Sequence, residues 1–229
     1  MARVHLLGAW FGIAFIVFLF IGFVWLAGFM PAISPADTPE QVAALYQEET
    51  MGIRLGMAVL IAASIFFLPW VAAISECIRQ IDGDHSFYKS LQTMCGTAAF
   101  LFFLIPGMIF EVAAFRPERS PEITQLLNDI GWLFFLTPFP PFVLQALVIG
   151  LAILKDKRAT PILPRWLGYL CLWNAVLLIP AVIAFFFKTG PFAWNGIFPY
   201  WIPFAIFTIW MIAITVCMIK AINRSSATV

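Results

Sequence analysis

"NDIGWLFFLTPFPPFVLQ", residues 128–145, is an apolar stretch with a cluster of prolines at its centre. A proline inside a helix cannot bond the carbonyl four residues before it, and its ring clashes with that carbonyl. In hydrocarbon, a carbonyl left free in this way costs several kcal/mol unless another group satisfies it. The stretch therefore predicts a membrane span whose helix is broken near the bilayer midplane.

The composition of the whole chain supports a membrane location. Of its 229 residues, 62% are hydrophobic and only 11% are charged, whereas soluble domains carry about 25% charged residues. So much apolar surface does not fit inside a soluble core of this size. The net charge of +1, without a basic block, argues against a nucleic-acid partner. No linker or low-complexity tract divides the chain, so we expect one domain over residues 1–229.

Six apolar segments are long enough to cross a bilayer, since a spanning helix needs about 20 residues. The fold class predicted is thus an all-α membrane protein with six transmembrane helices. We place the spans near residues 6–30, 51–74, 91–115, 130–154, 166–187 and 197–219. The linker "TPEQVAALYQEE" after the first span begins with a capping-box pattern and predicts a short amphipathic helix lying on the membrane.

Basic residues at the span ends predict the orientation, because cytoplasmic loops are enriched in Lys and Arg. One side holds nine: Arg3, Arg79, Lys89, Lys155, Lys157, Arg158, Arg165, Lys220 and Arg224. The other side holds four: Arg54, Arg116, Arg119 and Lys188. Both termini are therefore predicted to be cytoplasmic. "IRLGM" (53–57) and "PRWLGYL" (164–170) open oppositely directed spans with Arg and Leu-Gly, a weak indication of an inverted 3+3 repeat.

The broken fourth span gives the first set of candidate site residues. Pro138, Pro140 and Pro141 release carbonyls that Thr137, Gln145 and Asn174 are placed to satisfy. Two interpretations remain open. The kink is closed by local hydroxyl and amide bonds, or it lines a polar cavity that binds a ligand, as discontinuous transporter helices do.

Ionisable residues near one end of the spans give the second set. Arg54, Glu111, Asp129 and Lys188 are expected at one level, because each lies close to the end of its span. They form either a self-neutralising set, with Glu111 paired to Arg54 and Asp129 capping a helix, or the polar rim of a cavity. Trp194 belongs to an aromatic segment at this level, read as an interfacial belt or as a lid.

Catalytic and cofactor signatures are missing from the sequence. Both histidines, His5 and His85, lie at span ends, and we find no GxSxG, HExxH, P-loop or dinucleotide motif. We therefore predict no cofactor and no metal site, and we do not expect an enzyme. Gly8 with Gly12 and Gly52 with Gly56 form small-xxx-small pairs, which predict close helix packing or a face for another subunit.

The strings "FRPERSPEITQLLND" (115–129), "TPFPP" (137–141), "PRWLGY" (164–169) and "FFKTGPFAWNG" (186–196) resemble an uncharacterised family of bacterial six-span membrane proteins. The resemblance covers most of the chain, from "MGIRLGM" (51–57) onward. It implies a six-span fold, a bacterial inner membrane and the topology above. It implies no activity and assigns no functional residue.

Three functions remain after this reading of the sequence. The first is a membrane protein that binds or transports a small lipophilic or amphipathic molecule through a cavity with a polar outer rim. The second is an accessory subunit of a larger membrane complex, or a homo-oligomer, that uses its small-residue faces as contacts. The third is an enzyme acting on lipid at the outer leaflet, for which the sequence offers acids but no nucleophile. Membrane lipid is the expected partner in each case.

Overall fold

The computed structural model describes residues 2–137 and 139–226 of the chain, and these residues form helices and connecting loops without any β-strand. Six helical spans are long and apolar enough to cross a membrane. The predicted all-α membrane fold with six spans is therefore confirmed. The spans, numbered 1 to 6 in chain order, are Val4–Leu26, Thr50–Asp82, Phe87–Phe115, Pro121–Lys155, Arg165–Phe186 and Ile197–Arg224.

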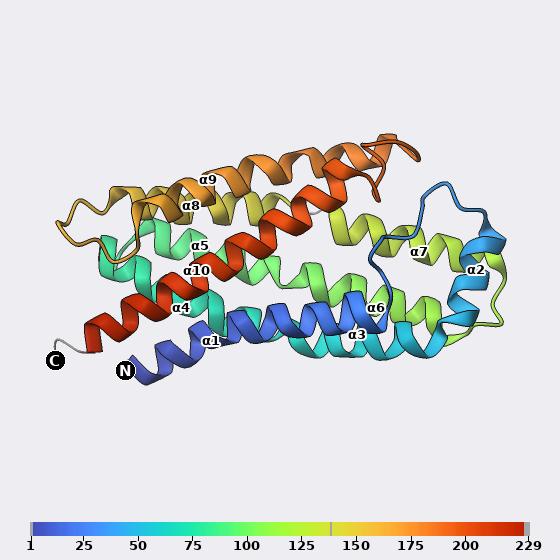
Figure 1. The fold of residues 1–229 in the computed structure, drawn as a ribbon, viewed down its shortest axis with the longest axis horizontal. Helices are drawn as coiled ribbons and strands as arrows, with labels where there is room; N and C mark the ends of the chain where they lie inside the picture. The colour runs from blue at the N-terminus through green and yellow to red at the C-terminus, as the bar shows by residue number, and fades with distance from the viewer. Residues whose placement is uncertain (1, 138, 227–229) are drawn as a thin grey trace.

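Each span consists of two helical segments, which meet near the middle of spans 2, 3 and 4 and closer to the far end of spans 1, 5 and 6. Both termini lie at one end of the molecule (Figure 1), and we call the half of each span on that side the near half and the other the far half. The near halves are α1 (Ala2–Leu19), α4 (Phe67–Asp82), α5 (Phe87–Ala99), α8 (Pro140–Lys155), α9 (Arg165–Leu178) and α10 (Ile202–Ser226). The far halves are η1 (Phe20–Leu26), α3 (Thr50–Ser64), α6 (Leu101–Phe115), α7 (Pro121–Leu136), η2 (Ile179–Phe186) and η3 (Ile197–Trp201).

Prolines account for most of these divisions. Pro140 occupies the first position of α8, where the missing N–H costs nothing. Pro180 lies at the start of η2, where the α-helix changes to a 3-10 helix, and Pro203 follows the change from η3, a π-helix, to α10. In span 2 the chain turns at Ile65 and Phe66, just before Pro69. The broken fourth span predicted from the sequence is thus one of several divisions at a similar depth.

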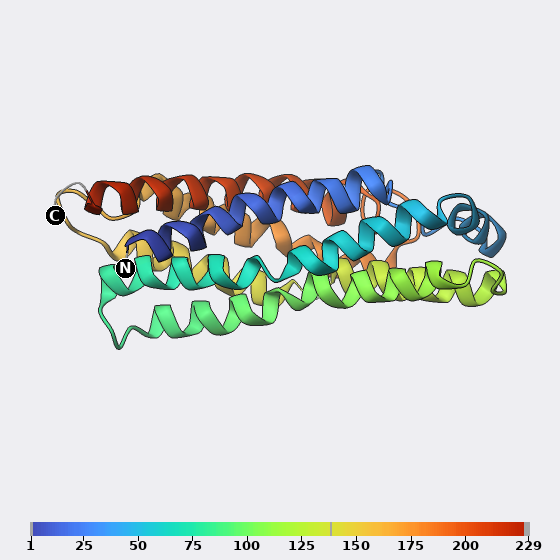
Figure 2. The same ribbon diagram turned by 90° about the horizontal axis from the view of Figure 1, so that it is seen from below.

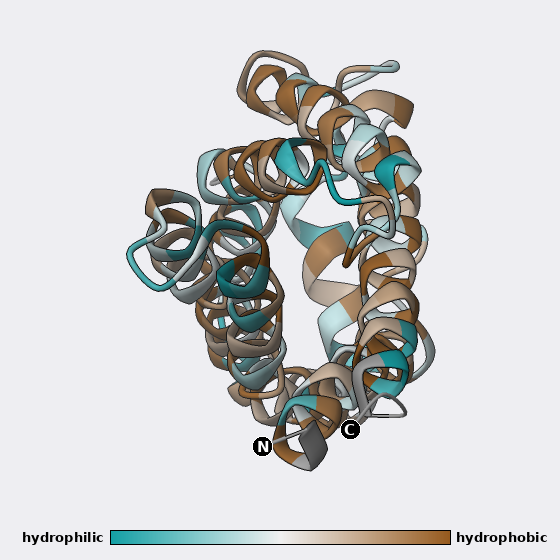
Figure 3. Ribbon diagram, turned by 90° about the vertical axis from the view of Figure 1, so that its left-hand side faces the viewer, coloured by the Kyte–Doolittle hydropathy of each residue, from teal (hydrophilic) through white to brown (hydrophobic). Residues whose placement is uncertain are grey.

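The helices surround a common axis, as the view along the bundle shows (Figure 3), and the spans pack in chain order. In the near half α1 packs on α4, α4 on α5, α5 on α8, α8 on α9, α9 on α10, and α10 returns to α1. In the far half α3 packs on η1 and on α6, and α6 packs on α7. The contact of α7 with η2 is sparser, so spans 4 and 5 separate there. The inverted relation between the two halves of the chain stays a prediction.

Glycines allow the closest approaches between helices. A Cβ at Gly22 of η1 would lie 2.6 Å from the carbonyl oxygen of Gly56 in α3. On the other side of the bundle, a Cβ at Gly150 of α8 would lie 2.9 Å from the carbonyl oxygen of Gly168 in α9. Gly8 packs against Pro69 in the same manner. The glycine pairs read from the sequence thus serve packing between spans 1 and 2 rather than a free face for another subunit.

A short helix covers the far end of the bundle. α2 (Pro39–Glu48) begins with the expected capping box, formed by Thr38 and Gln41. It lies across the far ends of the spans (Figures 1 and 2), packed mainly on α7. Its apolar residues Val42 and Tyr46 are buried within the protein. The prediction that this helix lies on the membrane is therefore wrong, because its apolar face is used by α7.

The span boundaries differ from the predicted ones chiefly in span 4. That span starts at Pro121 rather than at residue 130. The turns Pro121–Asp129 extend the helix and pack against α2, with Thr124 and Asn128 buried. Consequently Asp129 lies inside α7 and is not an N-cap, which is Ser120.

Replacing Gly56 by leucine tests the glycine contact between spans 1 and 2. The added side chain would meet Gly22 and the Cβ of Ala27, 2.8 Å from the new Cβ. We expect Gly56→Leu to destabilise the protein by about 1–3 kcal/mol or more, the usual effect of overpacking. Thermal unfolding in detergent measures it, with Ala62→Leu on the exposed face of α3 as the matched control. Equal melting temperatures for both variants would contradict the contact.

Candidate functional site

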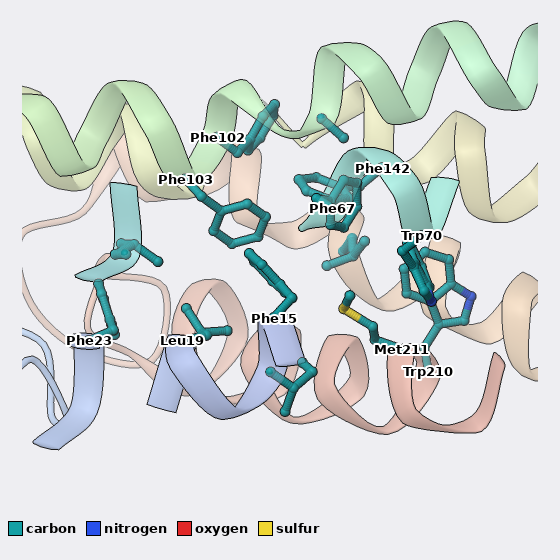
Figure 4. Close-up of a cluster of buried hydrophobic side chains, with 14 of the residues drawn as sticks. Phe15, Leu19, Phe23, Phe67, Trp70, Phe102, Phe103, Phe142, Trp210 and Met211 are labelled. Atoms are coloured by element: carbon teal, nitrogen blue, oxygen red, sulfur yellow. The ribbon is translucent and has the colours of Figure 1, made fainter. Parts of the chain in front are cut away.

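An apolar cavity of about 80 Å³ lies where the span halves meet. Five of the six spans contribute to its wall, and aromatic rings dominate it. Figure 4 shows part of this cluster, with Leu19, Phe102, Phe103 and Phe142 converging on one region. The lining residues are Leu19, Phe102, Phe103, Phe135, Leu136, Phe139, Phe142, Leu178, Ala181, Pro199, Tyr200, Pro203, Phe204 and Phe207.

Ring-to-ring contacts hold this wall together. The ring centroid of Phe142 lies 4.8 Å from that of Phe102 and 5.4 Å from that of Phe207, both in edge-to-face arrangement. Such pairs are favourable beyond the area that they bury. Among the described residues of the lining, Tyr200 alone has a polar side chain, and its hydroxyl donates to the carbonyl of Phe29 at 2.5 Å. The cavity therefore presents carbon almost everywhere.

The break between α7 and α8 separates this cavity from a second hollow on the other side of the span. That hollow is a groove of about 570 Å³. Phe135, Leu136 and Phe139 face the cavity. The groove is lined by Ile130, Leu133, Phe134, Thr137, Pro140, Pro141 and Phe185. Because these residues come from α7, α8 and η2, the groove lies where spans 4 and 5 separate.

Local hydrogen bonds end α7 just before the break, at a carbonyl other than those of Phe134, Leu136 and Thr137, which the prolines release. The hydroxyl of Thr137 donates to the carbonyl of Leu133 at 2.5 Å, and the Thr137 amide donates to the same carbonyl at 3.0 Å. Ser64 closes the end of α3 similarly, donating to the carbonyl of Ile61 at 2.7 Å. Local bonds and a hollow thus occur together at this break, and ligand binding there stays a prediction. The expected polar wall is wrong, because the hollow is apolar. Pro138 lies outside the described residues.

The two predicted amides lie near the cavity but not in its wall. Gln145 on α8 and Asn174 on α9 are fully buried. Neither side chain has a hydrogen-bonding partner among the residues that the structure describes. Buried polar groups are hydrogen-bonded in the large majority of cases, so this pair requires an explanation, which is taken up below.

The charged residues at the far end do not form the predicted pair. Among the described residues no salt bridge joins Arg54 to Glu111, although they lie within electrostatic range. The Arg54 guanidinium instead lies over the ring of Phe115, 5.7 Å from its centroid. Asp129 is half-buried on α7, and Lys188 is exposed after η2. None of the four lines the cavity or the groove, so they do not form its rim.

At the far end, hydrogen bonds made by aromatic residues hold α2 and the first loop to the spans. The buried Oδ1 of Asn128 accepts from the Tyr46 hydroxyl at 3.3 Å and from Trp132 Nε1 at 3.1 Å. Trp194 Nε1 donates to the carbonyl of Ile33 at 2.7 Å and ties the first loop to the last. Trp194 is thus buried and holds the two loops together, and it is not part of an interfacial belt. Together with the Tyr200 bond, these contacts hold α2 and the first loop over the bundle.

Ionic contacts join the loops at the near end. Lys155 pairs with Asp82, and Arg79 pairs with Glu76 at 2.6 Å and with Asp84 at 2.9 Å. The hydrogen bond from Arg79 holds the pKa of Asp84 below its usual value. These carboxylates therefore have basic partners. In the part of the chain that the structure describes, no group of three or more His, Cys, Asp or Glu residues is arranged to hold a metal ion.

The cavity wall was not foreseen from the sequence. Its phenylalanines are a small fraction of the 25 in the chain, and nothing in their spacing separates them from lipid-facing ones. A usable signal is the adjacency of Phe102 and Phe103 to the turn at Phe100, and of Phe142 to the proline cluster.

Comparison with known proteins adds no assignment. No protein-family model, no curated protein and no solved structure matches the chain. The function is therefore argued from the cavity, the groove and their surroundings.

The burial of Tyr46 predicts a pH dependence of stability. Burial, and secondarily the charge of Asp129, raises the pKa of Tyr46 far above its ordinary value near 10. Above about pH 10 the unfolded chain releases this proton while the folded chain keeps it, so the free energy of unfolding falls as pH rises. Below that pH the contribution is fully present.

Unfolding of the wild type and of Tyr46→Phe between pH 8 and about pH 11.5 measures this effect. At pH 8 we expect the variant to be less stable by about 0.5–1.5 kcal/mol, because it loses the bond to Asn128. Above about pH 10 the gap should shrink, because only the wild type carries a phenol at this position. Parallel pH profiles would contradict the assignment.

Proposed function

We propose that this chain is a bacterial inner-membrane protein, with both termini in the cytoplasm, that binds or moves a lipophilic molecule taken directly from the bilayer. The observation that carries the proposal is the apolar cavity at the level of the span breaks, next to an open groove between spans 4 and 5. On this orientation the groove lies in the outer half of the membrane, between α7 and η2.

The walls of the cavity favour access from lipid over access from water. Every lining residue belongs to a span, and none belongs to a loop at either end. At the far end α2 and the first loop are fastened by Tyr46, Trp194 and Tyr200. A water-soluble substrate would need an aqueous path, whereas a lipophilic one needs only a lateral opening.

The size of the cavity limits what it holds. A cavity of about 150 Å³ lined by aliphatic and aromatic groups is large enough for benzene, and this one is about 80 Å³. It therefore accommodates a few methylene groups or a branched chain end. Half-buried rings such as Phe139 and Phe204 lie in its wall and leave the rest of the ligand a way out toward lipid. The ligand class that fits is a chain or narrow lipophile with one end inserted.

The two alternatives have less support. An accessory subunit was argued from free small-residue faces, but Gly8, Gly12 and Gly56 are buried between helices of the same chain. A lipid-modifying enzyme would use Glu111 or Asp129, and neither lines the cavity or the groove. Each alternative predicts a different result in the experiment below. An accessory subunit would co-purify with a protein partner, and a lipid-modifying enzyme would co-purify with a chemically altered lipid.

Filling the cavity tests the proposal. Ala181 on η2 lines the cavity and is 2% exposed, whereas its neighbour Val182 faces outward and is 44% exposed. We expect Ala181→Phe to remove a co-purifying lipophile, because the ring occupies the space that the ligand needs, and Val182→Phe to retain it. Native mass spectrometry of the gently purified proteins measures the bound mass. Equal occupancy in both variants, or no bound lipophile in the wild type under any extraction, would overturn the proposal.

A further inference from the structure

Two amide side chains are buried in the near half of the bundle without a hydrogen-bonding partner. Gln145 on α8 and Asn174 on α9 are both 0% exposed. Both the oxygen and the nitrogen of each amide are unpaired. An amide pair of this kind can donate and accept, and leaving it unpaired in a low-dielectric interior costs free energy.

Helical geometry places these amides directly beyond the cavity. Gln145 follows the cavity residue Phe142 by three positions on α8, and Asn174 precedes the cavity residue Leu178 by four positions on α9. Residues three or four apart share a helix face. Since the rise is about 1.5 Å per residue, both amides lie one turn, about 4.5–6 Å, toward the near end from the cavity. Two neighbouring helices thus place an amide at one level.

The packing beside Gln145 leaves room for its side chain. A Cβ at Gly96 of α5 would lie 2.7 Å from the Gln145 amide nitrogen. Any larger residue at Gly96 would therefore displace the amide. The side chain of Val71 on α4 borders the same space. The glutamine is thus accommodated by the bundle without being bonded by it.

A third buried amide shows that this interior does satisfy polar groups elsewhere. Gln92 on α5 is also 0% exposed. Its nitrogen donates to the carbonyl of Val71 at 3.2 Å, and its oxygen accepts from the Ser75 hydroxyl at 2.7 Å. Gln92 therefore has a structural role, and the contrast with Gln145 and Asn174 points to a role that the folded chain alone does not complete.

We infer that Gln145 and Asn174 are the polar end of the ligand site, and that they hydrogen-bond an uncharged hydroxyl or carbonyl group at the inserted end of the lipophile. The inference rests on the proposed function and defines its ligand class. An uncharged group is favoured because the cavity wall contains no ionisable side chain except the engaged Tyr200. A carboxylate or amine entering this space would be left without a counter-ion.

Three probes of equal chain length test the ligand class on the wild-type protein. Hexadecane, hexadecanol and hexadecanoate are titrated in detergent micelles, and bound mass is read by native mass spectrometry. We expect hexadecanol to bind more tightly than hexadecane by about fivefold or more, since one net hydrogen bond corresponds to about that factor. We expect hexadecanoate to bind more weakly than hexadecanol. Equal affinities for alcohol and alkane, or tightest binding of the carboxylate, would overturn the inference.

Variants of matching shape separate a ligand role from a structural one. Asn174→Leu and Gln145→Met replace unpaired amides with apolar groups of similar size. We expect each to raise the melting temperature of the ligand-free protein while it lowers hexadecanol affinity about fivefold and leaves hexadecane binding unchanged. The control Gln92→Met should lower the melting temperature, because it removes the hydrogen bonds of Gln92 with the Ser75 hydroxyl and the Val71 carbonyl, without changing the preference for alcohol. Destabilisation by the first two variants with unchanged alcohol preference would show a structural role and overturn the inference.

The same data distinguish this inference from the proposed function. If hexadecane binds and Ala181→Phe abolishes its binding, the cavity is a lipophile site, regardless of the affinity measured for hexadecanol. If hexadecane binding is absent or unaffected by Ala181→Phe, the proposed function itself fails. The wild-type probe series needs no variant, so a variant that does not fold leaves the test intact.

Discussion

Every backbone donor and acceptor within the hydrocarbon must find its partner inside the protein, and this requirement governs the whole structure. Each proline in a span removes one donor and releases one carbonyl. Here the breaks gather at one depth, where α3 meets α4, α7 meets α8 and α9 meets η2. Local hydroxyls, those of Ser64 and Thr137, bond carbonyls at two of these junctions.

The cavity is a consequence of the same breaks. Helices that change direction or hydrogen-bond pattern in mid-span cannot keep even contact along their length. Glycine contacts draw the helices together away from the breaks, at Gly22 and Gly56 in the far half and at Gly150 and Gly168 in the near half. Large rings fill most of the space between these levels. What they leave is the apolar hollow beside Phe142, because planar rings packed edge to face do not fill an irregular space completely.

The sequence was sufficient to predict features that depend on local composition. Six apolar runs of sufficient length give six spans, the proline cluster gives the break in span 4, and the Thr38 capping box gives α2. Features that depend on which surfaces meet were not predictable from it. The amphipathic pattern of α2 looks the same whether its apolar face contacts lipid or α7. Asp129 resembles a helix cap until it is known that the helix begins earlier, at Pro121.

The same contrast between predictable and unpredictable features holds for the candidate site residues. Gln145 and Asn174 were identified because an amide in an apolar span is conspicuous, and both are buried near the break. The charged residues at the far end were placed in the site because charge near a membrane often marks function, yet they lie apart from the cavity. Their positions at span ends let them reach the surface, as Arg54 and Lys188 do. The two amides lie deep within their spans, whereas the charged residues lie at span ends. Depth within the span, and not charge, therefore distinguishes the residues near the cavity from those far from it.

The free-energy balance of a ligand taken from the bilayer connects the apolar cavity to the buried amides. A lipophile that leaves lipid for an apolar cavity gains no hydrophobic free energy, because both environments are hydrocarbon. Close packing against rings contributes shape selection, but a hollow of about 80 Å³ allows few contacts. A hydrogen bond differs in this respect, since a polar group dissolved in lipid has few partners and an unpaired amide has none. In the proposed site the amides would therefore supply the free energy that the apolar wall lacks, and the wall would keep water from hydrogen-bonding the amides in place of the ligand.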